Sequence, residues 1–453
     1  MKEHRQIITF EEALKSTRRN SIELFKKHVN PEEANLLKLA NVDKRYIRAE
    51  GIYLYDDEGK SYMDFSAGYG ALNLGHNPPE VLEAVRNASS LPSILLAGYN
   101  HLMGALAANL SELLPGNLTM TAFGSGGAEA VELALKTARA YSHRKKFISC
   151  HNAYHGLTFG ALSVGGATRY RRVFGPLLEH CETIPFGDLE SLEQKLRGGD
   201  VAAFIIEPVQ GEGGAIVPPC GYLKDAEELC HRYGALLILD EIQTGFGRTG
   251  KLFALEYDGA VPDIVILSKS LGAGVIPISV SVTTEEIWKK AFGARDRFDL
   301  VISTFGGNPG ACAAALKTIE ITLRDDLSGR AADIGRYSKE RLEMLKSKHS
   351  LIKEIRGKGL MLGIELNSPS IGGAALRENL APMIISHLLN NHGILTSYYD
   401  LAPLVLRFEP PLTVTKDQVD KAVDSLDAAF SKGVVGLGAA FGKSALGRII
   451  RSP

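Results

Sequence analysis

Residues 263–274 read DIVILSKSLGAG. The four apolar residues 264–267 predict a buried strand, and Lys269 follows just before a glycine-rich turn. A lysine at the inner end of a buried strand is unusual, because burial disfavours its charged form. A single lysine in this position is more often solvated or ion-paired than functional, so its role depends on the rest of the sequence.

Length and composition describe an ordinary globular protein. The chain has 453 residues, enough for about three domains or for one large α/β domain with additions. Apolar residues make up 45% and charged residues 23%, and the formal net charge is −1. Such a charge gives no overall attraction to nucleic acid or anionic membranes, so we expect no nucleic-acid partner.

The cysteines and the N-terminus indicate a compartment. The five cysteines are scattered without a CxxC pair, which favours a reduced protein over a disulfide scaffold or a zinc site, and we expect no metal. The first twenty residues lack the apolar core of a secretory signal. No run approaches the roughly 18 apolar residues that span a bilayer. We therefore expect a cytoplasmic protein with no membrane span.

Strand-like and helical patterns alternate between about residues 100 and 320. Helical patterns occupy 101–114, 128–143 and 222–234, and strand patterns occupy 201–209, 235–242 and 263–270. This alternation predicts an α/β fold, in which a mainly parallel sheet is covered by helices on both faces.

The flanking regions differ from this centre. Residues 11–40 are helical and charged, and 52–65 predict a β-hairpin. Beyond about 325, helices near 330–346 and 380–391 and strands at 359–366 and 404–412 predict a small α+β domain. We expect an N-terminal segment (1–72), a large domain (73–322), a small C-terminal domain (323–430) and a tail (431–453).

The tail is glycine-rich, apolar and basic. GKS at 442–444 would complete a phosphate-binding loop only with glycine at 437, where the chain has Leu437, and no strand precedes it. We therefore reject a nucleotide site there. We expect a loosely ordered terminus or a segment that packs on a neighbour, with membrane contact as the other alternative.

Asp240 ends a second apolar run, ALLILDEI. The carboxyl ends of parallel strands are where open α/β sheets place ligands, and an ionised buried carboxylate implies a cationic partner. The plainer alternative for this Asp is a turn or helix cap. Because the strands before Asp240 and Lys269 are separated by one short crossover, the two residues can face the same crevice.

A glycine-rich turn precedes the helical pattern at 128–143. FGSGGAEA supplies Gly126, Gly127 and Ala128, whose small size lets backbone N–H groups approach an anion at a helix N-terminus. A phosphate cradle, a buried acid and a strand-end lysine together match pyridoxal phosphate. The acid would keep the ring nitrogen protonated, and the lysine would form the internal Schiff base and move the proton.

Over about residues 20–430 the sequence resembles the class III (subgroup II) pyridoxal-phosphate-dependent aminotransferases of fold type I. The motifs that agree in order and spacing are GSGGAEA, AYHG, IIEPVQGEGG, LDEIQTGFGRTG, SKSLGAG, STFGGNP and LRFEPPL. In the first motif Gly126 and Ala128 replace hydroxyl residues of the family, so only backbone contacts to phosphate remain there.

The resemblance implies a role for each matched residue. It assigns Lys269 and Asp240 to catalysis, and Gly126, Gly127, Ala128, Tyr154, His155, Glu207, Ile242, Gln243 and Thr304 to the cofactor. Tyr154 would stack on the ring, Gln243 would bind the ring hydroxyl, and Thr304 would reach the phosphate of a partner subunit, which implies a homodimer. Taken singly, Tyr154 can equally be a core aromatic and Thr304 an ordinary strand residue.

Substrate recognition rests on three further residues. Arg407 matches the family's carboxylate clamp, and Glu212 matches the acid that neutralises this arginine in members acting on ω-amines. Tyr69 lies in the region that lines the family's substrate entrance. Arg407 could instead be structural, paired with a buried acid.

The resemblance is greatest to putrescine and other ω-amine aminotransferases. It implies transfer of an amino group from a primary amine or diamine such as putrescine to a 2-oxo acid, with 2-oxoglutarate expected. The alternatives are amination of a longer-chain aldehyde, an acetylornithine or ornithine aminotransferase, another pyridoxal enzyme such as a decarboxylase, and a binding protein with a degenerate site. The intact Lys269, Asp240 and Gln243 set argues against the last.

Overall fold

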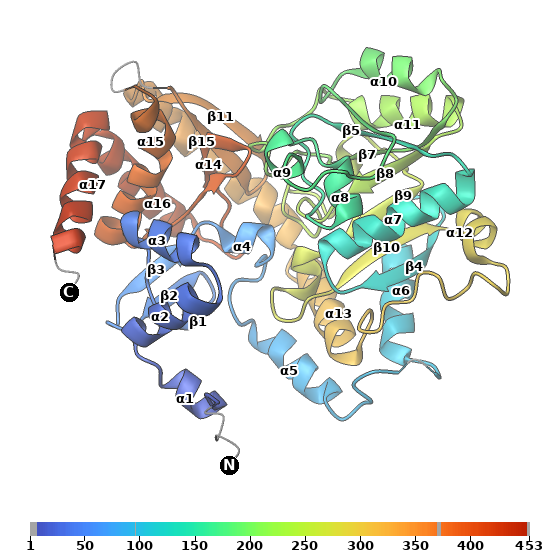
Figure 1. The fold of residues 1–453 in the computed structure, drawn as a ribbon, viewed down its shortest axis with the longest axis horizontal. Coiled ribbons are helices and arrows are strands. Elements are labelled where there is room, and N and C mark those ends of the chain that lie inside the picture. Colours follow the sequence, from blue (N-terminus) through green and yellow to red (C-terminus); the bar gives the residue numbers. More distant parts are fainter. Residues whose placement is uncertain (1–6, 96, 369–372, 451–453) are drawn as a thin grey trace.

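The computed structural model describes residues 7–95, 97–368 and 373–450. Figure 1 shows two halves: the central sheet with its helices in one, and the N-terminal and C-terminal elements together in the other. Among the described residues, no helix combines the length and apolar character needed to cross a bilayer.

The larger half is built on a seven-stranded sheet. In spatial order its strands are β4 (Leu118–Gly124), β10 (Ser279–Thr284), β9 (Ile264–Leu267), β8 (Leu236–Asp240), β7 (Val201–Ile206), β5 (Lys146–Cys150) and β6 (Cys181–Ile184). β10 runs antiparallel to both its neighbours, and the remaining pairs are parallel. The predicted α/β class with a mainly parallel sheet is confirmed.

Helices cover both faces because both faces are apolar. In β8, Leu237 and Leu239 join one core cluster, while Leu236 and Ile238 join another on the opposite face. The first cluster packs against α6 (His101–Leu113), α10 (Leu189–Leu196), α11 (Tyr222–Arg232) and α13 (Pro309–Arg324), and the second against α7 (Gly127–Ser142), α8 (Phe159–Val164) and α12 (Glu285–Phe292). The helices expected at 101–114, 128–143 and 222–234 correspond to α6, α7 and α11.

The smaller half contains two four-stranded sheets. The first is β1 (Tyr46–Glu50), β2 (Tyr53–Asp56), β3 (Ser61–Asp64) and β13 (Ile394–Leu395), and the second is β11 (Ile352–Lys358), β12 (Met361–Leu366), β15 (Ala402–Phe408) and β14 (Tyr398–Tyr399). β2 and β3 form the predicted hairpin, but β13 comes from the far end of the chain and pairs in parallel with β3. The helices are α1 (Phe10–Leu14), α2 (Arg18–His28), α3 (Pro31–Leu39), α14 (Leu327–Lys348), α15 (Gly373–His387), which continues into a π-helical turn, and α16 (Lys416–Phe430).

The expectation of a loosely ordered tail was wrong. Residues Gly433–Ile450 form helix α17, which lies against α15 and α16 (Figure 1). Leu437 is buried in the same core as those helices, which gives the segment an apolar contact within its own chain. The GKS sequence lies inside this helix, so no phosphate-binding loop follows a strand there.

Glu241, directly after β8, is a buried acid that anchors the following turn. It is 0% exposed and accepts hydrogen bonds from the Leu255 backbone N–H (2.7 Å) and the Thr244 hydroxyl. Burial raises the pKa of this carboxyl to about 7, and the neighbouring Asp240 adds to the effect.

We predict that Glu241→Gln weakens the pH dependence of stability. The folded state holds this proton up to about pH 7, whereas the unfolded state releases it near pH 4.5. Between those values the folded state binds more protons, so the free energy of unfolding falls as pH rises. Urea unfolding at pH 4.5 and 7.5 should show that the free energy of unfolding of the wild type falls by up to roughly 3 kcal/mol more than that of the variant. Equal pH slopes for the two proteins would contradict this.

Candidate active site

A cavity of about 280 Å³ lies at the carboxyl ends of β8 and β9. The two strands pair in parallel with Asp240 opposite Ile266, which places Asp240 and Lys269 at the same edge of the sheet. Nine of the residues singled out from the sequence line this cavity: Gly127, Ala128, Tyr154, His155, Glu207, Asp240, Ile242, Gln243 and Lys269. The crossover topology has therefore brought together motifs up to about 140 residues apart.

Lys269 enters the cavity from a strained turn. Its φ of +45° lies in the left-handed region, which a residue with a Cβ seldom adopts. Nζ donates to Gln243 Oε1 at 3.0 Å, and among the described residues no carboxylate lies within ion-pair distance of it. Burial lowers the pKa of Lys269, with partial opposition from Glu212. The amine is thus held closer to the neutral, nucleophilic form than a solvated lysine.

Asp240 and His155 form a buried pair. His155 Nδ1 and Asp240 Oδ2 are 2.7 Å apart, and Asp240 Oδ1 accepts from the Ile242 backbone N–H at 3.1 Å. Burial alone would lower the pKa of His155, but the Asp240 carboxylate outweighs it and the pKa is raised. The pair therefore favours a charged imidazolium beside a carboxylate.

Glu207 supports the wall beside this pair. Its carboxylate accepts from the backbone N–H groups of Tyr154 (3.0 Å) and Gly211 (2.8 Å), so it holds two loops together. Burial raises its pKa to about 7, against the opposing effect of His155. These contacts make Glu207 a positioning residue for Tyr154.

The glycine-rich turn lies at the end of the cavity where the N-terminus of α7 could bind an anion. Gly126 is the N-cap of α7, and the first backbone N–H groups of a sixteen-residue helix have no partner within the helix. A Cβ on Gly127 would lie 3.0 Å from Ile242 Cδ1, so a side chain there would crowd Ile242. The absence of side chains leaves the backbone open to a ligand.

These groups fit the cofactor that the resemblance implies. Pyridoxal phosphate needs an anion site for its phosphate, an acid for its ring nitrogen and an amine for its aldehyde. The helix end at Gly127, the Asp240 carboxylate and Lys269 Nζ supply the three around one cavity. Gln243, which also lines the cavity, accepts a hydrogen bond from Lys269 Nζ at its carbonyl oxygen.

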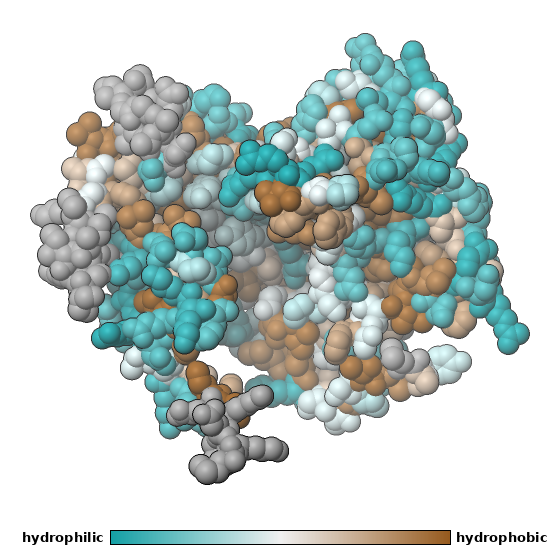
Figure 2. Space-filling view, in the orientation of Figure 1, coloured by the Kyte–Doolittle hydropathy of each residue, from teal (hydrophilic) through white to brown (hydrophobic). Residues whose placement is uncertain are grey.

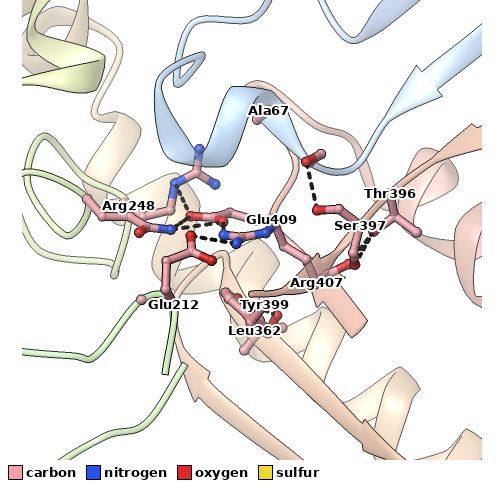
Figure 3. A network of polar contacts seen from close by, with 12 residues as sticks. Ala67, Glu212, Arg248, Leu362, Thr396, Ser397, Tyr399, Arg407 and Glu409 are labelled. Carbon is pink, nitrogen blue, oxygen red and sulfur yellow. Dashed lines mark hydrogen bonds and ion pairs between the residues drawn. The ribbon is translucent and has the colours of Figure 1, made fainter. Parts of the chain in front are cut away.

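Arg407 adjoins the cavity within a polar network (Figure 3). It is 1% exposed; one guanidinium nitrogen bonds Glu212 Oε1 at 2.8 Å and another bonds Glu409 Oε2 at 2.7 Å. Its guanidinium carbon lies 4.0 Å from the ring centre of Tyr399 and 4.9 Å from that of Tyr69. Arg407 therefore makes both of the contacts expected from the sequence. It pairs with a buried acid, Glu409, as a structural arginine would, and it also pairs with Glu212.

Tyr69 reaches this arginine from an unusual turn. Residues Ala67–Gly70 form the short element α4, and all four have positive φ values between 43° and 82°. Asp64 accepts from the Ser66 and Ala67 backbone N–H groups and so braces the start of the turn. The turn holds a half-exposed Tyr69 between the Arg407 guanidinium and the surface.

Thr304 does not join the other residues. It is exposed on the segment between α12 and α13 and does not line the cavity of its own chain.

Three residues of this network were not among those expected from the sequence: Glu409, Arg248 and Tyr399. All three are fully buried and contact the Arg407 network. Glu409 lies two residues after Arg407, and the period of two in a strand places both on one face, so this signal was present in LRFEPPL. Arg248 and Tyr399 carried no comparable signal.

Comparison with known proteins places this geometry in a family. The model of the family described as aminotransferase class-III matches residues 39–430. Aminotransferase PigE of Serratia sp. is 36% identical over 450 residues, which cover 90% of this chain and 53% of that protein. The chain therefore spans about half the length of this curated relative.

Two solved structures are similar over nearly their whole length. The ornithine aminotransferase of Toxoplasma gondii has a TM-score of 0.83 and 33% identity, covering 93% of this chain and 98% of its own. A PLP-bound amine transaminase from an uncultivated Pseudomonas species has a TM-score of 0.77 and 32% identity, covering 86% of this chain and 95% of its own.

Proposed function

The chain belongs to the class-III aminotransferases, a pyridoxal-phosphate-dependent family, and we propose that it moves an amino group from a primary amine or diamine to a 2-oxo acid. Putrescine is the proposed type of amine, and 2-oxoglutarate the proposed acceptor. The observation that carries the proposal is the pairing of Arg407 with Glu212. A substrate without a carboxylate can bind beside this pair without leaving a buried guanidinium unpaired.

Arg407 and Glu212 can also allow the acceptor, 2-oxoglutarate, to bind. If Glu212 turns away, Arg407 can offer its freed nitrogen to the carboxylate of 2-oxoglutarate as a charge-assisted hydrogen bond. Glu212 is held by the Asp400 backbone N–H at 3.1 Å as well as by Arg407, so two contacts must be exchanged. One pocket can thereby accept two chemically different substrates in turn.

We assign the chemistry at the reacting carbon of the substrate to the residues that line the cavity at the ends of β8 and β9. When bound, pyridoxal phosphate supplies an electron-withdrawing ring that stabilises negative charge at that carbon. Asp240, held in place by its contact with His155, would bind the N–H of the protonated ring nitrogen. Lys269 Nζ would accept a proton from the substrate carbon and return it, as its lowered pKa permits.

Ornithine-type transamination is the second candidate. The similarity to an ornithine aminotransferase supports it, and ornithine also presents a primary ω-amine. Amination of a longer-chain aldehyde is the same reaction run in the opposite direction.

We expect the enzyme to transfer the amino group of putrescine to 2-oxoglutarate, and Lys269→Ala to abolish this turnover. Among the described residues that line the cavity, Lys269 is the only lysine, so the variant loses the amine proposed to act on the substrate. Glutamate formation should be measured with putrescine, ornithine, N-acetylornithine and long-chain amines. Lys251→Ala, at an exposed lysine, is the matched control. Rates for Lys269→Ala comparable to wild type would refute its role, and turnover of ornithine alone would favour the second candidate.

Arg407 and Glu212 should have opposite effects on the two half-reactions. Arg407→Ala should slow the glutamate half-reaction by roughly two to three powers of ten and affect the amine half-reaction much less, because only glutamate brings a carboxylate to the guanidinium. Glu212→Ala should favour glutamate relative to the amine. Stopped-flow spectroscopy can follow each half-reaction separately. Equal losses in both half-reactions for both variants would make Arg407 a structural residue.

We further propose that the active form is a homodimer. Thr304 can act at a cavity only if a second chain provides one, since it lies outside the cavity of its own chain. The same segment exposes Phe298, Leu300, Ile302 and Phe305. Figure 2 shows hydrophobic residues on the side of the molecule where α12 and α13 lie, as expected of a surface that meets a partner.

Sedimentation velocity should give twice the 48.9 kDa mass of the chain. Ile302→Asp should shift the protein toward monomer and reduce activity, since it buries a charge in the proposed interface. Val173→Asp, at another exposed apolar residue outside that segment, is the control. A fully active monomer would exclude this proposal.

A further inference from the structure

Glu409 contacts three other members of the Arg407 network: Arg407 itself, Arg248 and Gln243. Its side chain is 0% exposed. Oε2 bonds an Arg407 nitrogen at 2.7 Å, and Oε1 lies 3.8 Å from Arg248 Nε. Gln243 Nε2 adds hydrogen bonds to both oxygens at 3.1 and 3.2 Å. Figure 3 shows the carboxylate between Arg248 and Arg407.

Arg248 carries a buried positive charge and therefore needs an acidic side chain that stays beside it. Its guanidinium is completely buried and is fixed by hydrogen bonds to the carbonyl oxygens of Leu360 and Pro410 and to Asn73 Oδ1. Two buried guanidinium groups therefore lie on either side of one carboxylate, and a buried charge without a partner is strongly destabilising. Glu409 partly neutralises both.

A count of the buried charges relates Glu409 to substrate choice. With Glu212 in place, two guanidinium groups face two carboxylates and the network is neutral. When Glu212 withdraws, one positive charge is left over, which one substrate carboxylate can balance. Without Glu409 the network would keep a positive charge even with Glu212 in place, and it would favour anions throughout.

Glu409 has little freedom to move, unlike a residue that exchanges partners. The left-handed turn covers it: a Cβ on Gly70 would lie 2.9 Å from Glu409 Oε1, and Gly70 has φ +82°. Glu212, by contrast, lies in the loop between β7 and α11 with its side chain 9% exposed. Of the two acids that pair with Arg407, Glu212 is therefore the one able to leave.

The same acid sets the orientation of Gln243. A carboxylate only accepts hydrogen bonds, so Gln243 presents its amide nitrogen to Glu409 and its carbonyl oxygen to Lys269 Nζ. Glu409 thereby connects the arginine network to the lysine.

We propose that Glu409 is a specificity-determining positioning residue: a fixed counter-ion, shared by Arg248 and Arg407, that leaves Arg407 room for one further carboxylate, either Glu212 or the substrate's. The inference deepens the proposed function and rests on its amine and 2-oxo acid substrates. Glu409 itself contacts no reacting atom.

Two variants that change the charge of the network in opposite directions test this role of Glu409. Glu409→Gln removes a negative charge, and Arg248→Gln removes a positive one, with little change in the polar character of either site. Glutarate, a dicarboxylate that cannot react, should be titrated calorimetrically into the holoenzyme of each. Glu409→Gln should bind glutarate about tenfold more tightly and Arg248→Gln about tenfold more weakly, each equivalent to about 1.4 kcal/mol. The amine half-reaction should change in the opposite sense.

Glu227→Gln is the matched control, because Glu227 is a buried acid on α11 paired with Lys224. It should leave glutarate affinity unchanged. Shifts of the same sign in Glu409→Gln and Arg248→Gln, or no shift in either, would overturn the proposal, since simple structural damage weakens binding in both.

Folding of the variants is checked by thermal unfolding. If Glu409→Gln does not fold, Arg248→Gln and the charge-retaining Glu409→Asp carry the test: Arg248→Gln should weaken glutarate binding, whereas Glu409→Asp should leave it nearly unchanged. Tighter binding by Arg248→Gln, or equal weakening in both variants, would overturn the proposal. A wild-type enzyme that transfers amino groups from no amine would refute the proposed function, whereas the glutarate affinities would still decide the role of Glu409.

Discussion

The parallel pairing of β8 with β9 is the constraint on which the site depends. Parallel strands end at the same edge of a sheet, so their register places Asp240 beside Ile266 and brings Lys269 to the same cavity. The apolar residues of these strands bury both faces, and a shift by one residue would exchange the two core clusters. The ligand groups are therefore aligned by the same packing that stabilises the sheet.

Burial then sets the chemistry of the groups at this edge. The protein interior stabilises charges poorly, so Lys269 is driven toward its neutral form while Asp240 keeps a partner in His155. Arg407 cannot lose its proton in the same way and instead keeps carboxylate partners. An amine with a lowered pKa and a permanently charged guanidinium can thus lie within one connected network, linked through Gln243 and Glu409.

The smaller half of the molecule supplies most of the residues that we propose bind the substrate. Arg407 comes from β15, Glu409 from just after the end of that strand, Tyr69 from the turn after β3, and Glu212 from the loop between β7 and α11. The N-terminal hairpin is completed by β13, and its residues share a core with α14, α15 and α16. Segments from both ends of the chain therefore hold the arginine against the cavity, which makes its environment sensitive to the packing of both.

The sequence by itself determined the class of fold, the strand-end positions of Asp240 and Lys269, and the glycine-rich helix start, because periodicity and strand order are local patterns with direct consequences in a parallel sheet. It also indicated Arg407 and Glu212 through their motifs. The approach of Arg248 to Glu409, the addition of β13 to the N-terminal hairpin and the packing of the tail helix against α15 were decided by tertiary structure. Each depends on contacts between segments far apart in the chain, and no local pattern specifies which distant partner a buried charge or an apolar face will find.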